Sequence, residues 1–464
     1  MTDIFSIANR VLKIAEEEGA DHCEVYIMNR NKTDYTFEVK AGKKTFNGIS
    51  STIRGIAIRA AKGGKLGFGY SSDFSEEALR FTIRSVLSVA EETQGFEGFT
   101  TPKTVSEVKG TYDDETANLS IEKAMELIDL FEDSIKGVNE DILILESSLR
   151  HCVISTVIVN TAGVEVEEKG TYIGIGTTLS VKGKEKITYP FNSSRRTMNS
   201  LDLEKLGETA ANDVLRLTEK KSIETGDYEV ILSPKVLAEL LSYSFTTSLC
   251  ADQVQAKLSV LEGKVGEKIA SEKLTLYDDG TYEEGLYTTK FDDEGTPTQK
   301  TLLIEKGVLK GFLYDSITAN IDNVESTGNC VRWEPPTWDV FFARSFSCRP
   351  RVWMSNLVIE PGSKKLDELV GEISKGLFLL NIFSGFTMSP SGDFNLPVVH
   401  GYIIEKGEIT GAIKEATIQG NVFETLKGIN AVGADIDIVI PDSTSGSLIS
   451  PHIRLEKLKV ISAD

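Results

Sequence analysis

The hydrophobic pattern of this chain changes its period near residue 20, and that change constrains the fold more than any other feature. Apolar residues first recur at helical spacing, at Ile4, Ile7, Ala8, Val11, Leu12 and Ala15. This stripe predicts an amphipathic helix that Asp3 can cap and Gly19 ends. From Val25 to Val39 apolar residues alternate with polar ones instead, which predicts β-strands. Because helices and strands occur in separate runs, the expected fold class is α+β.

The same pattern divides the chain into two domains. Helices are expected at 76–92 and 121–136, strands between 148 and 189, and a polar helix at 203–219. The charged segment 220–226 ends in glycine, which indicates a domain boundary. We therefore expect an N-terminal mixed α/β-sheet domain at 1–222 and a β-rich C-terminal domain at 223–464.

Local signals predict several elements in more detail. Hairpin turns are expected at 62–65 (KGGK), 304–307 (IEKG) and 404–407 (IEKG). The last two place glycine where a positive φ is needed, and they indicate two similar hairpins in one sheet system. Ser233 and Pro234 are typical of a helix start, and an apolar helix is expected from there to about Cys250.

Charge and cysteine content exclude several classes of protein. The chain carries 50 Lys+Arg against 70 Asp+Glu, and the net charge of −20 argues against a nucleic-acid or anionic-membrane surface. Its five cysteines are widely spaced and include no C-x-x-C pair, so neither a disulfide framework nor a zinc finger is expected. The first helix carries Asp3 and Arg10 and is not a signal peptide, and the most apolar stretch, 376–386, is too short to span a bilayer. A cytoplasmic location follows as the expectation.

Short catalytic motifs are missing from the sequence. The four histidines, His22, His151, His400 and His452, form no H-E-x-x-H or H-x-H pair. There is no G-x-S-x-G elbow and no phosphate-binding glycine loop. Ser120 stands in an S-x-x-K pattern, but it also occupies the position of a helix N-cap, and we favour the cap.

Two segments remain as candidate sites. Asp292, Asp293 and Glu294 form the densest acidic cluster. They could hold Mg²⁺ or Ca²⁺ or act as acid and base, but a loop with solvated or backbone-capping carboxylates is the favoured interpretation.

The second segment combines an arginine with two tryptophans. Arg332, Trp333 and Trp338 could form a surface that binds a peptide or a subunit, because Trp and Arg dominate binding hot spots. The alternative is a loop buried against its own domain, and the sequence leaves both possibilities open.

Longer motifs extend over the whole chain and resemble those of the TldD/PmbA family. They are EGAD at 18–21, EVY at 24–26, FDDEGTPT at 291–298, LIEKGVL at 303–309, TGN at 327–329, NLVIEPG at 356–362, SGDF at 391–394 and GYII at 401–404. The resemblance implies a cytoplasmic protease built from two related subunits, in a family also named for modulating DNA gyrase. In such a pair the TldD subunit holds the metal with H-E-x-x-x-H on a helix and a cysteine near its C-terminus, whereas the PmbA (TldE) subunit lacks these ligands.

This sequence departs from the metal-binding pattern. On the helix after Pro234, Ser242 and Thr247 stand where the resemblance places histidines, and Tyr243 stands where it places the glutamate. No cysteine follows Cys348. Neutral hydroxyls are poor zinc ligands, and Tyr is a weak base at pH 7.

The resemblance together with the lost ligands predicts a non-catalytic, metal-free PmbA/TldE-like subunit. It would bind no cofactor, with zinc held only by a TldD-like catalytic partner. It would help to degrade or mature unfolded peptides, and it would form either a pseudo-symmetric heterodimer with that partner or a homodimer in isolation.

Two other hypotheses stay open. One is an autonomous metallopeptidase that uses His400, His452 and an acid from the 292–294 cluster. The other is a non-enzymatic regulatory protein of the gyrase-modulator type.

Overall fold

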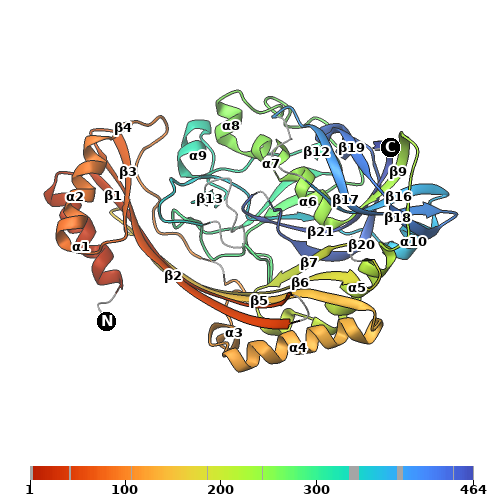
Figure 1. The fold of residues 1–464 in the computed structure, drawn as a ribbon. Helices are drawn as coiled ribbons and strands as arrows, with labels where there is room; N and C mark the ends of the chain where they lie inside the picture. The colour runs from red at the N-terminus through yellow and green to blue at the C-terminus, as the bar shows by residue number, and fades with distance from the viewer. Residues whose placement is uncertain are drawn as a thin grey trace.

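The computed structural model describes residues 4–40, 43–105, 107–184, 187–242, 244–333, 344–383, 390–442 and 444–462. Within these residues, one sheet contains the strands up to β7 and a second, larger sheet contains most of the later ones. The expected α+β class is confirmed. Figure 1 shows the first sheet curving beneath the C-terminal half of the chain.

The first sheet is antiparallel, with strand order β4-β3-β2-β1-β5-β6-β7. Its strands are β1 (His22–Lys40), β2 (Lys43–Lys62), β3 (Lys65–Ser71), β4 (Glu91–Glu92), β5 (Ile142–Asn160), β6 (Glu165–Val181) and β7 (Tyr189–Arg195). The predicted turn at 62–65 joins β2 to β3, with Gly63 and Gly64 at φ 58° and 78°. The long strands β1, β2, β5 and β6 carry the curvature of the sheet.

Side chains of β1 pack in three different cores, two on the outer face of the sheet and one on the opposite face. Val25 and Ile27 pack with the helices at one end of the outer face, and Tyr35 and Phe37 pack with those at the other end. Tyr26 lies between Val25 and Ile27 in the sequence and points to the opposite face of the sheet. There it packs against residues of the C-terminal half. The sequence pattern predicted the strand, but it did not show that both of its faces would be covered.

Helices cover the outer face of this sheet (Figure 1). They are α1 (Ile4–Glu17), α2 (Glu76–Ser88), α3 (Asp114–Ala117), α4 (Ile121–Val138) and α5 (Leu203–Arg216), with a short 3-10 turn at Met198–Ser200. Ser120 caps α4 by accepting a hydrogen bond from the backbone of Lys123, which confirms the cap. The expectation that α2 reaches residue 92 was wrong, because Glu91 and Glu92 pair with β3 instead.

The second sheet contains ten strands along its main path and two beside it, among the residues described. Its strands are β8 (Lys220–Lys221), β9 (Gly226–Leu232), β10 (Leu276–Asp279), β11 (Lys300–Glu305), β12 (Val308–Leu309), β15 (Asn356–Ile359), β16 (Lys375–Ile382), β17 (Asp393–Glu405), β18 (Glu408–Ile413), β19 (Ala416–Asn421), β20 (Ile429–Val439) and β21 (Ser447–Ser462). A separate pair is formed by β13 (Cys330–Val331) and β14 (Arg351–Val352). The strands β9, β16 and β21 lie at the centre of the large sheet.

Short helices complete the C-terminal half. They are α6 (Pro234–Leu241), α7 (Ser244–Leu249), α8 (Ala251–Gln255), α9 (Ser316–Asp322), α10 (Leu366–Gly371) and α11 (Val422–Lys427). One large apolar core lies in this half. Another core joins Ile128 and Phe131 of α4 to Ile231, Phe378 and Tyr402 of the second sheet. The division after residue 222 therefore stays a prediction, since apolar packing continues across it.

The two similar hairpins are confirmed in the second sheet. Lys306 and Gly307 join β11 to β12 with φ of 46° and 81°, and Lys406 and Gly407 join β17 to β18 with φ of 54° and 80°. Two successive residues at positive φ are typical of the turn that matches strand twist. A Cβ at position 307 would lie 2.3 Å from the carbonyl oxygen of Ala270, so this turn also needs glycine for space.

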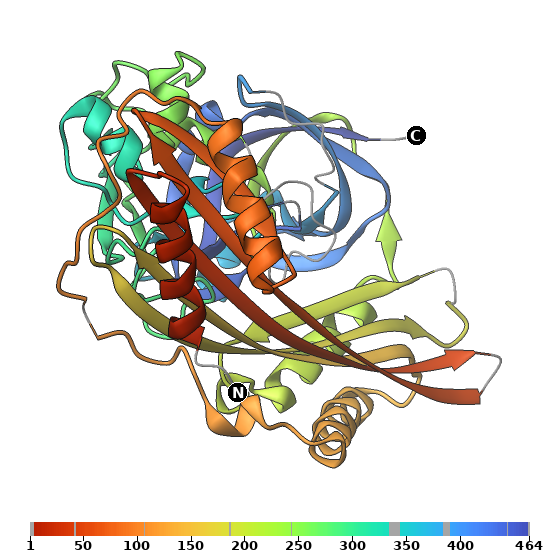
Figure 2. The same cartoon turned by 90° about the vertical axis from the view of Figure 1, so that its left-hand side faces the viewer.

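One edge of the first sheet is left open. Only residues 56–62 of β2 pair with β3, and no described strand pairs with the outer edge of residues 43–55. Phe46, Ile49 and Ile53 on this stretch are exposed. Figure 2 shows the ends of β1 and β2 reaching the rim of the molecule.

All five cysteines are buried. Among the described residues, none of the helices combines the length and the apolar character needed to cross a membrane.

Candidate functional site

The helix after Pro234 begins as predicted and ends earlier than expected. Ser233 caps it by accepting a hydrogen bond from the backbone of Val236. The expected continuous helix to Cys250 was wrong, because α6 ends at Leu241 and α7 begins at Ser244.

Hydroxyl side chains account for the break. Ser242 donates to the carbonyl of Glu239 at 2.9 Å, and Thr246 donates to that of Leu241 at 2.9 Å. Ser and Thr bonding back to the preceding turn compete with the helix ladder and bend helices.

Of the positions that matter for the metal motif, Ser242 lies between these two helices and Thr247 lies within α7. Ser242 is buried and Thr247 is half-buried. Tyr243 lies outside the described residues.

The C-terminal tail runs beside this segment. Thr246 Oγ1 lies 3.6 Å from Met354 Sδ, and a Cβ on Gly446 would lie 2.6 Å from Met354 Cγ. The backbone N–H of Asp442 donates to Glu239 Oε1 at 2.6 Å. The fold thus brings together the two chain segments from which the resemblance draws its metal ligands.

The side chains present at this place do not fit zinc. They offer hydroxyls in place of imidazoles and a thiolate, and hydroxyls are poor ligands for this ion. Lys235 also supplies a cation, with Nζ 3.3 Å from Glu239 Oε1 and 2.5 Å from Asp442 Oδ1. Burial opposes the charge of Lys235, yet the two carboxylates hold its pKa above the usual value.

A cavity of about 680 Å³ opens beside the first turn of α6. The segments 233–235 and 440–442 line one side. The opposite side consists of residues of β1, β5 and β6 together with 189–194 of β7. Since β7 pairs only with β6 among the described strands, an edge of the first sheet borders this cavity.

The acidic cluster lies elsewhere, between the two halves of the chain. Arg59 donates to both oxygens of Glu24, at 2.8 and 2.6 Å, and to Glu294 Oε1 at 2.8 Å. Arg332 donates to Glu24 Oε1 at 2.9 Å. All four side chains are buried, and we call Glu24, Arg59, Glu294 and Arg332 the buried charge layer.

The interpretation of the acidic segment as a solvated loop was wrong, and its backbone-capping role is confirmed. Asp292 accepts from the backbone N–H groups of Glu294, Thr296 and Cys330, and Asp293 accepts from that of Arg332 at 2.7 Å. Burial raises the pKa of Asp292 well above its usual value. Burial also disfavours the charge on Glu294, but Arg59 holds the pKa of that carboxyl below its usual value.

Arg332 and Trp333 are buried within their own chain. The Trp333 ring lies 4.7 Å from that of Trp353, centroid to centroid, and the Arg351 guanidinium lies 4.6 Å from the Trp333 ring. Trp338 lies outside the described residues. A role of these three residues in binding substrate or partner stays a prediction.

Within the described residues, one group of metal-ligand type comes together, namely Glu294, Asp315 and Cys330, with ligand atoms within 4.8 Å of one another. Sequence spacing gives no sign of it. Arg59 already supplies a cation to Glu294, so this group is not a free ligand set. Neither His400 nor His452 belongs to it; they pack against Tyr189 and Phe378 at centroid distances of 5.1 and 5.5 Å.

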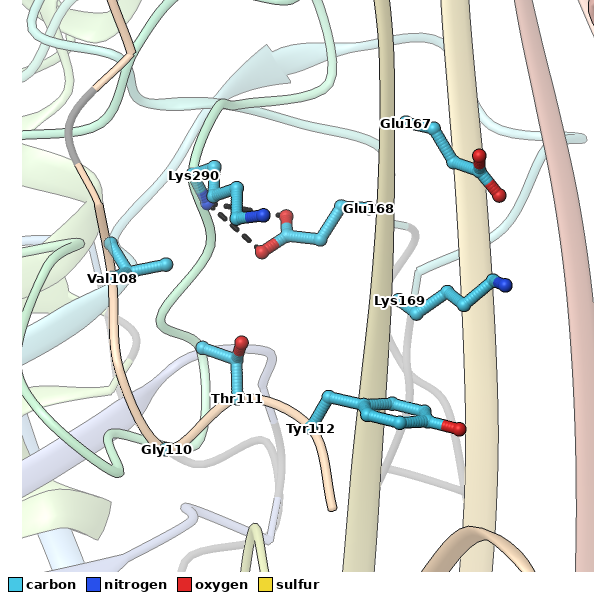
Figure 3. Close-up of a pocket in the computed structure, with 8 residues that line it drawn as sticks. All are labelled: Val108, Gly110, Thr111, Tyr112, Glu167, Glu168, Lys169 and Lys290. Atoms are coloured by element: carbon cyan, nitrogen blue, oxygen red, sulfur yellow. Dashed lines mark hydrogen bonds between the residues drawn. The ribbon is translucent and has the colours of Figure 1, made fainter. Parts of the chain in front are cut away.

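A second, open groove of about 410 Å³ lies at another point along β6 (Figure 3). The segment 108–112 forms one wall and 167–169 of β6 the other, with Lys290 between them. Both carboxylate oxygens of Glu168 accept from the backbone N–H of Lys290, at 3.0 and 3.2 Å. The sequence analysis did not identify Glu168, because a single buried carboxyl on a strand has no local signature.

Family comparisons cover almost all of the chain. The PmbA/TldA metallopeptidase domain 1 matches residues 23–90, the central domain of that family matches 114–218, and its C-terminal domain matches 225–462. An uncharacterized protein of Methanocaldococcus jannaschii is 29% identical over 96% of this chain and 97% of its own. The metalloprotease TldD homolog of Buchnera aphidicola is 26% identical over 82% of this chain and 79% of its own.

Solved structures share the fold over nearly the full length. A candidate modulator of a DNA gyrase from Thermotoga maritima has a TM-score of 0.82 at 26% identity, over 99% of this chain and 100% of the other. TldE from Thermococcus kodakarensis has a TM-score of 0.84 at 24% identity, over 98% of this chain and 100% of the other.

Proposed function

The chain belongs to the PmbA/TldA metallopeptidase family, and we propose that it acts there as a subunit without a metal site of its own. Its role would be to complete a chamber for an unfolded peptide beside a metal-bearing TldD-like subunit. The observation that carries this proposal is a pair of hydroxyls, Ser242 after α6 and Thr247 on α7, next to a C-terminal tail without cysteine. Such a site lacks the imidazole and thiolate ligands that a catalytic zinc needs.

The cavity beside α6 supports the chamber role. Its 680 Å³ lie within the size range of ligand pockets. Strand β7 borders it and is an edge strand of the first sheet, and an extended peptide can add to such an edge through main-chain hydrogen bonds. Recognition through the main chain suits substrates that share no sequence.

The open edge of β2 supports a role as one subunit of a pair. Residues 43–55 leave backbone groups along that edge without a strand partner in the described part of the chain, and Ile49 and Ile53 are exposed there. A long exposed edge with apolar side chains promotes pairing with another chain. In the proposal this edge belongs to the surface that meets the TldD-like subunit, or a second copy when the chain is isolated.

The central experiment compares the chain alone with the chain purified together with a TldD-like subunit. Alone, it should contain no stoichiometric zinc by elemental analysis and should not cleave an unfolded peptide. Together, the two should form a complex with peptidase activity that exceeds the activity of either subunit. One zinc per isolated chain would instead favour an autonomous metallopeptidase, and a stable complex with gyrase in the absence of a protease partner would favour the regulatory hypothesis.

A pair of variants tests the proposed partner surface. The double variant Ile49→Lys, Ile53→Lys should weaken the complex, because charges on a strand edge oppose pairing with another strand. Phe81→Lys is the matched control, since Phe81 is an exposed apolar residue on α2, away from that edge. Analytical ultracentrifugation measures both, and equal association by the double variant and the wild type would assign the interface to another surface. The cytoplasmic location stays a prediction from cysteine content.

A further inference from the structure

Arg196 is a buried cation without a carboxylate partner. Its residue is 1% exposed, and its guanidinium lies 4.2 Å from the Tyr172 ring centroid. Its hydrogen bonds go to neutral oxygens, the hydroxyl of Tyr172 and the carbonyls of Thr111, Leu286 and Thr288. Within the described residues no carboxylate lies within ion-pair distance of this group, whereas buried charges are ordinarily paired.

A cavity of about 30 Å³ lies against this guanidinium. That volume exceeds the roughly 10–15 Å³ needed for one water molecule. Arg344 and Thr289 line the same cavity. Three polar atoms on these residues have no hydrogen-bond partner, namely Arg196 Nε, Arg344 Nε and Thr289 Oγ1.

The unpartnered atoms are mainly donors. An Arg Nε–H can only donate, and a threonine hydroxyl can donate as well. Arg344 Nε lies 3.5 Å from Asp293 Oδ2, whereas Arg196 has no carboxylate within ion-pair distance among the described residues. Two guanidiniums and a hydroxyl around one cavity therefore call for an acceptor with negative charge.

One carboxyl group also lines this cavity. Glu168 lies between it and the groove of Figure 3, where its oxygens are held by the backbone of Lys290. Burial raises the pKa of Glu168, and the charges of Arg196, Arg344 and Lys290 oppose this rise. An anion in the cavity would repel the ionised form of Glu168, so its binding should be accompanied by uptake of a proton.

We propose that the cavity bounded by Arg196, Arg344 and Thr289 binds a small monovalent anion, either a halide or the carboxylate of a small acid. The ligand accepts hydrogen bonds from the two Nε–H groups and from the threonine hydroxyl. It supplies the direct ion-pair partner that Arg196 lacks among the described residues. This site is separate from the α6–α7 segment and does not depend on the proposed protease role.

Crystals soaked in sodium bromide or sodium acetate test the proposal directly. Bromide should give an anomalous peak inside the cavity, and acetate should give planar density there if a carboxylate is accepted as well. A peak with either probe supports the site and distinguishes the two sources. Water alone in the cavity in both soaks would overturn it.

Solution measurements with matched variants decide whether the ion is adventitious. The thermal unfolding temperature of the wild type should rise with bromide concentration, and more steeply at pH 5 than at pH 8. Thr289→Val should raise the apparent dissociation constant for bromide about tenfold, because one hydrogen bond to a charged ligand is lost. Thr301→Val is the control, since Thr301 Oγ1 also lacks a partner but lies on β11 away from the cavity.

A second variant, Gly170→Ala, keeps the guanidinium of Arg196 but should change its position. A Cβ at position 170 would lie 2.7 Å from Arg196 Nη2, so Gly170→Ala should displace the guanidinium and remove the bromide peak. Identical bromide dependence in the wild type, Thr289→Val and Gly170→Ala would show an adventitious ion only, and would overturn the proposal.

Discussion

Two buried polar regions of this molecule differ in which groups satisfy their hydrogen bonds and charges. At the junction of α6 and α7, the hydroxyls of Ser242 and Thr246 donate to backbone carbonyls at the end of α6. In the buried charge layer, arginines and glutamates from both halves of the chain satisfy one another. The first region has neutral hydroxyls at the positions where the resemblance places metal ligands, and the second concentrates charge where the halves meet. Removing a polar side chain should therefore change the free energy of unfolding by very different amounts in the two regions.

The largest effect is expected in the buried charge layer. Arg59→Leu leaves both Glu24 and Glu294 buried without their main partner. Breaking a buried ion pair costs about 3–5 kcal/mol because the remaining charge is uncompensated. The free energy of unfolding, measured by urea denaturation, should fall by about that amount.

The control for this change is Arg80→Leu. Arg80 pairs with Glu17, Glu18 and Glu76, as Arg59 pairs with two acids, but at the protein surface. Exposed pairs add little because water screens them, so this variant should lose only a small fraction of the stability that Arg59→Leu loses. Equal losses in the two variants would break the comparison between buried and exposed charge.

A smaller effect is expected from a carboxyl that neighbours the layer. Burial, and next the charge of Glu294, raise the pKa of Asp315 to about 6. A raised carboxyl pKa stabilises the fold below the unfolded value near 3.9, and that stabilisation is lost as the pH rises through 6. Asp315→Asn cannot ionise and retains an N-cap acceptor for Thr318.

The measurement for Asp315 is the free energy of unfolding as a function of pH. The variant should match the wild type near pH 4 and become more stable than it above pH 6, by up to about 3 kcal/mol. A difference between the two proteins that does not vary between pH 4 and 7 would show that Asp315 ionises normally in the folded chain.

The smallest effect is expected in the α6–α7 segment. Ser242→Ala removes one hydrogen bond to a backbone carbonyl, which contributes about 0.5–1.5 kcal/mol. Neither this change nor Thr247→Val should alter the peptidase activity of the complex with a TldD-like subunit. A loss of activity without a loss of stability would give these hydroxyls a chemical role and refute the comparison at this region.

Much of the local structure was predictable from the sequence. The caps at Ser120 and Ser233 and the turns at 62–65, 304–307 and 404–407 lie where the pattern placed them. These features depend on residues a few positions apart, so a short window contains their cause. The break between α6 and α7 was missed because it depends on which hydroxyls bond back to the helix, and an apolar pattern does not record that.

The candidate site was predictable only in part. The resemblance identified the helix after Pro234, and the structure places the tail around Asp442 beside it. The solvated interpretation of 292–294 failed because the partners of these carboxylates come from distant parts of the chain. The sequence did not predict any role for Arg196 or Glu168, because the groups that each of them contacts are distant in the sequence.

What the sequence determined by itself is therefore the α+β class, the family and the absence of histidine and cysteine from residues 234–249. The tertiary structure alone decided which charges are buried, because Glu24 and Arg332 are 308 positions apart and meet only when the two halves close. Charge interactions become strong only when water is excluded, and the exclusion of water is a property of the packed molecule.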